Sequence, residues 1–211
     1  MLILEKLWNP EILQTWKNSL IIKKGRDPMP LLKEDIYTID DIMNLPDGQR
    51  AELIDGKIYD MAPPSPLHQE IAGELFAAIH SYLKSKHGPC KPYLAPIGVF
   101  LSADENTNFV EPDLLVVCEP SKITQRGCEG APDFIIEVVS PGSRRMDYNK
   151  KNALYSDSGV REYWIVDPAK ERITVYHYEV DAAPAIFTFD QNVTVGIYGD
   201  LQICLNELLN Q

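Results

Sequence analysis

The sequence has no apolar run that approaches the roughly 20 residues needed to cross a bilayer. Residues 1–8 also lack the basic segment followed by an apolar segment that marks a secretory signal peptide. From these two absences we expect a cytoplasmic protein that does not insert into a membrane.

Cysteine is scarce and scattered. The four cysteines are Cys90, Cys118, Cys128 and Cys204, and no two of them have the Cys-x-x-Cys spacing. A structural zinc site needs clustered ligands, so none is expected. Because cytosolic thiols are kept reduced, we expect no disulfide.

Basic residues are fewer than acidic residues. The chain has 20 Lys and Arg against 31 Asp and Glu, which gives a net charge of −11. This excludes a broad DNA-coating surface, since phosphate binding depends on basic residues. It does not exclude a nuclease, because a cleft can be locally basic and bound metal ions offset carboxylates. No helix-turn-helix, zinc finger or basic arm is present to read bases.

The length and apolar content fit one folded domain with an appendage. The 211 residues are 45% hydrophobic, which is enough for a sizeable core. We assign residues 1–35 to an N-terminal extension with a short helix at 11–16 and a basic linker at 23–26, which is either solvated or in contact with an anionic partner. The domain then spans residues 36–211.

Helical and strand signals alternate along this domain, so we predict an α/β (α+β) fold. A capping box at Thr38 begins a short helix, and Asp55-Gly56 forms the turn of a hairpin over 51–61. The remaining predicted elements are helices at 68–83, 145–157 and 205–209, and strands at 93–101, 109–118, 134–140, 160–166 and 172–178.

Two carboxylates, Asp113 and Glu137, stand within apolar runs at 109–117 and 134–140. Burying a carboxylate costs free energy unless a cation or a proton satisfies it. If the two strands pair, both side chains open onto one edge of the sheet and can bind Mg²⁺, which prefers oxygen ligands. The alternative is that each carboxylate forms a structural salt bridge.

A lysine follows the second run. Lys151 lies four residues after Asp147, so the two share one helix face, a spacing that also fits an ordinary ion pair. Its neighbour Lys150 points about 100° away from that face.

The chain resembles the bacterial Uma family of restriction endonucleases, within the PD-(D/E)xK nuclease superfamily. The resemblance extends over residues of roughly 36 to 170 and is carried by six short segments in the expected order: 52–56, 68–69, 111–113, 137–141, 147–155 and 159–168.

This resemblance implies a restriction-endonuclease-like central mixed sheet flanked by helices, with Mg²⁺ or Mn²⁺ at one end. Asp113, Glu137 and the backbone carbonyl of Val138 would be the metal ligands. The superfamily lysine normally stands two residues after the second acid, where this chain has Val139. Its role would therefore pass to Lys151 on the following helix.

Further site residues follow from the same resemblance. Glu52 would be an additional acidic residue near the metal, or else belong to a surface pair. His68 would contact phosphate or water, or else only begin a helix, and Gln69 is a weaker candidate of that kind. Arg144 and Arg145 would bind phosphate or remain solvated. By contrast, apolar neighbours place three aromatic side chains in the core: Tyr155, Tyr163 and Trp164.

The expected function is that of a metal-dependent endonuclease that hydrolyses DNA phosphodiester bonds. A homodimer is expected because two strands must be cut. Two alternatives remain: a catalytically weak or inactive protein of the same fold that binds DNA or a partner, and a hydrolase of another phosphate compound.

Overall fold

The computed structural model describes residues 35–101, 106–180 and 182–210. The predicted extension, with its helix at 11–16 and its basic linker at 23–26, lies outside these residues apart from Asp35. Within the described part no helix is both long and apolar enough to span a membrane.

A six-stranded mixed sheet forms the centre of the domain, in the order β11-β10-β9-β8-β6-β3. Strands β8 and β9 are parallel, and the other neighbours are antiparallel. The strands are β3 (Lys91–Leu94), β6 (Leu114–Val117), β8 (Phe134–Val138), β9 (Glu162–Asp167), β10 (Arg172–His177) and β11 (Ala185–Thr188).

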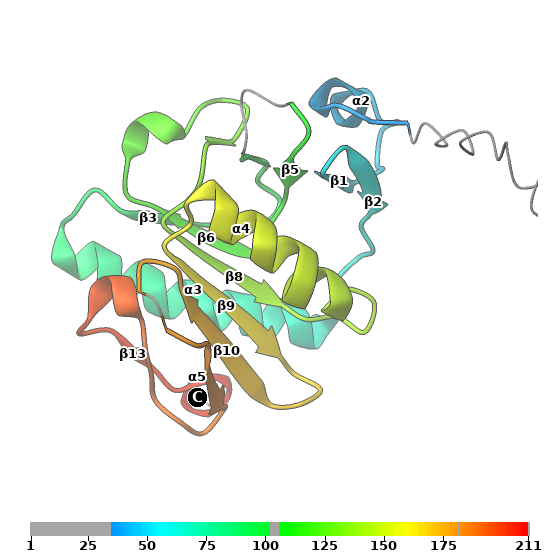
Figure 1. Ribbon diagram of the computed structural model, residues 1–211. Helices are drawn as coiled ribbons and strands as arrows, with labels where there is room; N and C mark the ends of the chain where they lie inside the picture. The colour runs from blue at the N-terminus through cyan, green and yellow to red at the C-terminus, as the bar shows by residue number, and fades with distance from the viewer. Residues whose placement is uncertain (1–34, 102–105, 181, 211) are drawn as a thin grey trace, which may run out of the picture. The chain divides into compact units, whose positions relative to one another are not determined.

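Helices cover both faces of this sheet, as the sequence predicted (Figure 1). Helix α3 (Pro66–Lys86) packs on one face, against alternate residues of β8 such as Phe134 and Ile136. On the other face, α4 (Asn152–Ser158) packs against Ile135 and its neighbours. Because successive strand residues point to opposite faces, Glu137 belongs to the α4 face.

A second, five-stranded sheet has the order β2-β1-β5-β4-β7. Its strands are β1 (Ala51–Ile54), β2 (Lys57–Asp60), β4 (Val99–Phe100), β5 (Phe109–Val110) and β7 (Cys128–Glu129). The predicted hairpin is confirmed as β1–β2, with positive φ at Asp55 (52°) and Gly56 (71°). The capping box of Thr38 begins α2 (Ile39–Met43).

Two predicted strands are in fact broken, and each break moves the chain from one sheet to the other. The segment 93–101 divides into β3 and β4 around a cis Ala95–Pro96 bond, and 109–118 divides into β5 and β6 around Pro112. Proline lacks an N–H and cannot donate to a ladder, although Pro92 is accommodated within the edge strand β3. Asp113 therefore stands just before β6, not in the middle of a strand.

The predicted helix at 145–157 is also irregular. It begins with a π-helical segment, η2 (Met146–Lys151), and continues as α4. The remaining elements of the described residues are η1 (Pro120–Lys122), β12 (Val193–Thr194), η3 (Gly196–Tyr198), β13 (Gln202–Ile203) and α5 (Leu205–Leu209). Helix α5 has the predicted bounds.

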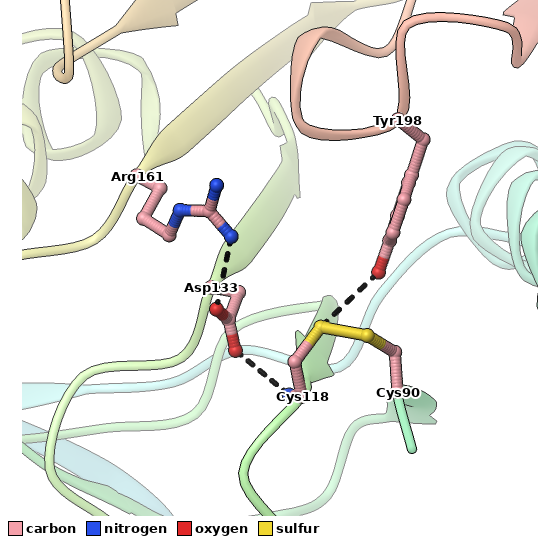
Figure 2. Close-up of a disulfide and its surroundings, with 5 residues drawn as sticks. All are labelled: Cys90, Cys118, Asp133, Arg161 and Tyr198. Atoms are coloured by element: carbon pink, nitrogen blue, oxygen red, sulfur yellow. Dashed lines mark hydrogen bonds and ion pairs between the residues drawn. A yellow bond between two sulfur atoms is a disulfide. The ribbon is translucent and has the colours of Figure 1, made fainter. Parts of the chain in front are cut away.

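The prediction of four reduced thiols is wrong for one pair. Cys90 and Cys118 form a disulfide (Figure 2). Cys128 and Cys204 are free and buried. The register of β3 on β6 pairs Lys91 with Val117, so the two cysteines come directly opposite each other one step further on. Cross-strand pairing brings together cysteines that are scattered in the sequence.

Candidate active site

The two predicted metal-binding carboxylates meet at one end of the sheet. In the β6–β8 ladder Leu114 pairs with Ile136, so the same register places Asp113 opposite Glu137. Residues directly opposite each other in an antiparallel pair have Cβ atoms about 4.5–5.5 Å apart. The backbone N–H of Val138 donates to Asp113 Oδ2 at 2.8 Å, which fixes the Asp113 side chain at this edge.

Lys151 lies in the middle of a buried cluster of carboxylates. Its Nζ is 2.8 Å from Glu52 Oε1, 2.9 Å from Glu137 Oε1 and 3.9 Å from Asp147 Oδ1. Only 5% of Lys151 is exposed. The π-helical turn of η2 carries both Asp147 and Lys151 inward, and such turns recur at functional sites.

The fourth acidic member of the cluster is supplied by the smaller sheet. Glu52 is the second residue of β1, and its side chain is buried. Besides pairing with Lys151, its Oε1 accepts from the backbone N–H of Glu111 at 3.0 Å. Glu52 therefore links the hairpin sheet to the chain segment that leads into Asp113.

The cluster perturbs the ionisation of its members. Burial raises the pKa of Glu137 well above its usual value, although the charge of Lys151 opposes this. Burial likewise raises the pKa of Asp147 to about 6. Burial by itself would lower the pKa of Lys151, but Glu137, Glu52 and Asp147 raise it overall, so the ammonium stays charged. Such perturbed groups are typical of functional sites.

His68 stands in the first turn of α3 and reaches Asp113. Its Nε2 lies 3.0 Å from Asp113 Oδ2, and its other ring nitrogen, Nδ1, is buried without a hydrogen-bond partner among the described residues. Burial lowers the pKa of His68, but the hydrogen bond and the charge of Asp113 raise it above the usual value. A protonated His68 would form an ion pair with Asp113.

The other residues proposed from the sequence lie outside this cluster. Lys150 contacts the hydroxyl and ring of Tyr59 at the surface. Gln69 is exposed. Arg144 pairs with the buried carboxylate of Asp167, and Arg145 is exposed. The three aromatic side chains are fully buried, as predicted.

Two members of the cluster were not proposed as site residues from the sequence. Asp147 was noted only as the neighbour of Lys151, and Tyr155 was assigned to the core. The hydroxyl of Tyr155 donates to Glu137 Oε1 at 2.8 Å. The signal was present as a spacing of four residues, 147, 151 and 155, which puts three polar groups on one helix face.

The oxygen atoms at this edge fit a hard divalent cation. No three His, Cys, Asp or Glu side chains in the described residues are grouped so as to hold a metal. Mg²⁺ does not require such a cage, because it binds through one or two carboxylates and keeps several waters. The hydrogen bonds to Glu137 all go to Oε1 and those to Asp113 go to Oδ2. Within the described residues, the second oxygen of each carboxylate therefore accepts no hydrogen bond.

Comparison with known proteins agrees with this fold. A crystal structure described as a putative nuclease belonging to DUF820, from Anabaena variabilis, has a TM-score of 0.67 with 23% identity, over 82% of this chain and 97% of the other. The "Uncharacterized protein slr1290" of Synechocystis is 25% identical over 63% of this chain and 68% of its own length. The model of the Uma2 family, described as "Putative restriction endonuclease", matches residues 37–197, and this chain belongs to that family.

Proposed function

We propose that this protein is a Mg²⁺- or Mn²⁺-dependent endonuclease that hydrolyses phosphodiester bonds in DNA. The observation that carries the proposal is the register of β6 on β8, which sets Asp113 opposite Glu137 beside the buried ammonium of Lys151. Membership of the Uma2 family supports the same reaction class.

Asp113, Glu137 and the carbonyl of Val138 would hold the metal ion. When bound, such an ion polarises the phosphate and lowers the pKa of an attacking water. The remaining side chains support the ligands: Val138 N–H and His68 fix Asp113, and the Tyr155 hydroxyl fixes Glu137.

Lys151 serves as a cation and hydrogen-bond donor, not as a base. Its raised pKa keeps the ammonium charged, so it can orient a water molecule or offset the negative charge that develops on phosphorus. Glu52 and Asp147 hold this ammonium in place. We also propose that two copies act together, since a duplex has two strands to cut.

Cleavage of supercoiled plasmid in Mg²⁺ or Mn²⁺ tests the proposal. We expect Asp113→Asn and Glu137→Gln to lower the rate at least about 100-fold, since even the outer partners of metal ligands cost 10–100-fold. Lys150→Ala is the matched control and should retain the wild-type rate. Calorimetric titration with Mn²⁺ should show binding that Asp113→Asn removes. Equal cleavage by wild type and Asp113→Asn would overturn the proposal.

A further inference from the structure

An open depression of about 460 Å³ has a basic lining and includes Tyr148 and Asn149, which follow Asp147 in the sequence. Its charged side chains are Arg144, Arg145 and Lys170, and Tyr148 and Asn149 complete the polar part of the wall. No acidic residue lines it. The chain has a net charge of −11, so a depression lined by three basic side chains and no acidic one differs from the acidic composition of the protein as a whole.

The three basic residues differ in what already engages them. Arg144 donates through both terminal nitrogens to Asp167, which is fully buried, so its charge is used within the fold. Arg145 and Lys170 are exposed. Within residues 35–101, 106–180 and 182–210, neither of these two side chains has a hydrogen-bond or ion-pair partner. The charges of Arg145 and Lys170 are therefore available to bind an external anion.

The sheet topology brings this depression to the same edge as the metal ligands. Strands β8 and β9 are parallel, with Val138 paired to Val166, so the segments that follow them leave the sheet side by side. The segment after β8 leads to Arg145 at the start of η2, and the turn after β9 carries Lys170. Figure 1 shows the loop before η2 and the β9–β10 turn at the same end of the sheet.

We propose that this depression binds a backbone phosphate of DNA near the phosphodiester that is cut. A guanidinium and an ammonium are the two side chains that bind phosphate best, the first as a planar fork and the second as a point charge. The Asn149 amide can donate a further hydrogen bond. Contacts of this kind set the position of a duplex without reading its sequence. The inference rests on the proposed function and adds where the substrate backbone lies.

The test measures binding without cleavage. Fluorescence anisotropy would follow a fluorescein-labelled 20-base-pair duplex with the full chain in EDTA, over a range of NaCl concentrations. The test variant is Arg145→Ala/Lys170→Ala, which removes the two unpaired charges and leaves the Arg144–Asp167 pair intact. The matched control is Lys84→Ala/Lys91→Ala, because both lysines are exposed and Lys91 pairs with Val117 at the far end of β6.

We expect the test variant to bind the duplex about 5- to 10-fold more weakly at low salt. Its plot of log affinity against log salt concentration should be shallower by about 0.9, since one phosphate contact contributes about 0.9 for a duplex. The control should match the wild type in both measurements, and both variants should have the wild-type melting temperature.

Three results would overturn the inference: no binding by the wild type, an unchanged affinity in the test variant, or an equal loss in the control. Failure of the proposed function has a different signature. If the plasmid stays uncut in Mg²⁺ and Mn²⁺ while duplex binding depends on Arg145 and Lys170, the surface is supported and the nuclease reaction is not.

Discussion

Glu162 and Glu137 are two buried glutamates on neighbouring parallel strands, but their surroundings are of opposite kinds. Glu162 is 0% exposed and Glu137 is 4% exposed. Glu162 accepts hydrogen bonds from Trp164 Nε1 (2.7 Å) and from the backbone N–H groups of Gly196 (3.1 Å) and Ile197 (2.9 Å). Glu137 instead faces the ammonium of Lys151 and three further carboxylates.

The hydrogen-bond partners of a buried carboxylate distinguish a structural role from a candidate active site. Glu162 accepts from fixed N–H donors of the protein, and these bonds connect β9 to the segment before β13. Glu137 belongs to a cluster with four acidic groups and one lysine at the sheet edge. Excess negative charge of this kind is unfavourable for folding and favourable for binding a cation, as expected when function costs stability.

The largest effect is expected from removing the cation of the cluster. Lys151→Met should lower the free energy of unfolding by about 3–5 kcal/mol, because it leaves buried carboxylates without their partner. Urea unfolding in EDTA would measure this. Lys150→Met removes an exposed lysine one residue away that contacts Tyr59, and it should change stability by less than about 0.5 kcal/mol. Equal losses in the two variants would show that Lys151 does not hold the cluster together.

Glu162→Gln should cost about 3 kcal/mol of stability, because an amide NH₂ would face donors that now point at a carboxylate. Plasmid cleavage per folded molecule should not change, since Glu162 lies at the other end of the β8–β9 pair from Glu137. Urea unfolding and cleavage assays on one preparation would measure both. Lost cleavage in a folded Glu162→Gln protein would remove the distinction between the two glutamates.

Asp147→Asn should act in the opposite direction and stabilise the metal-free protein. The pKa of Asp147 is about 6 in the folded protein, whereas an unperturbed aspartate has a pKa of 3.8, so folding disfavours the ionised form. Below pH 3.8 this carboxyl is protonated in both states and does not reduce the free energy of unfolding. As the pH rises through about 6, its ionisation in the folded protein lowers the free energy of unfolding.

At pH 8 we therefore expect the free energy of unfolding of Asp147→Asn to exceed that of the wild type by roughly 3 kcal/mol. One pKa unit corresponds to about 1.4 kcal/mol, and the pKa of about 6 already includes the attraction to Lys151. The two proteins should converge as the pH approaches 4. Urea unfolding in EDTA at several pH values would measure the difference, and a gap that widened toward low pH would contradict this account.

Much of the fold could be predicted because its signals are local. The Asp55-Gly56 turn, the capping box of Thr38 and the apolar face of α3 each act over a few residues. The broken strands and the disulfide could not be predicted in this way. Pro96 and Pro112 stand where strands end and the chain changes sheets, whereas Pro92 lies within β3, so a proline alone does not mark a break. Cys90 meets Cys118 only through the register of β3 on β6.

Part of the candidate active site could likewise be predicted from the sequence, and part of it needed the folded structure. Asp113, Glu137, Lys151, Glu52 and His68 were named from sequence, and the structure brings all five to one edge of the sheet. The hydrogen bond that Tyr155 donates to Glu137 was missed, because an aromatic residue among apolar neighbours gives a core signal. Only the folded helix shows that its hydroxyl is directed at the carboxylate.

Tyr155→Phe gives the smallest expected effect and the finest test of the cluster. The substitution keeps the ring packed against Tyr163 and removes one hydrogen bond to Glu137, which should cost about 1 kcal/mol of stability. If that bond orients Glu137 for a metal, Mn²⁺ affinity measured by calorimetry should fall about 10-fold, as for other groups that position ligands.

The matched control is Tyr163→Phe, because the hydroxyl of Tyr163 donates to the backbone oxygen of Asp147 and not to a carboxylate. Tyr163→Phe should lose similar stability and keep the wild-type Mn²⁺ affinity. An equal fall in affinity for both variants would mean that packing, not the hydroxyl of Tyr155, sets the position of Glu137.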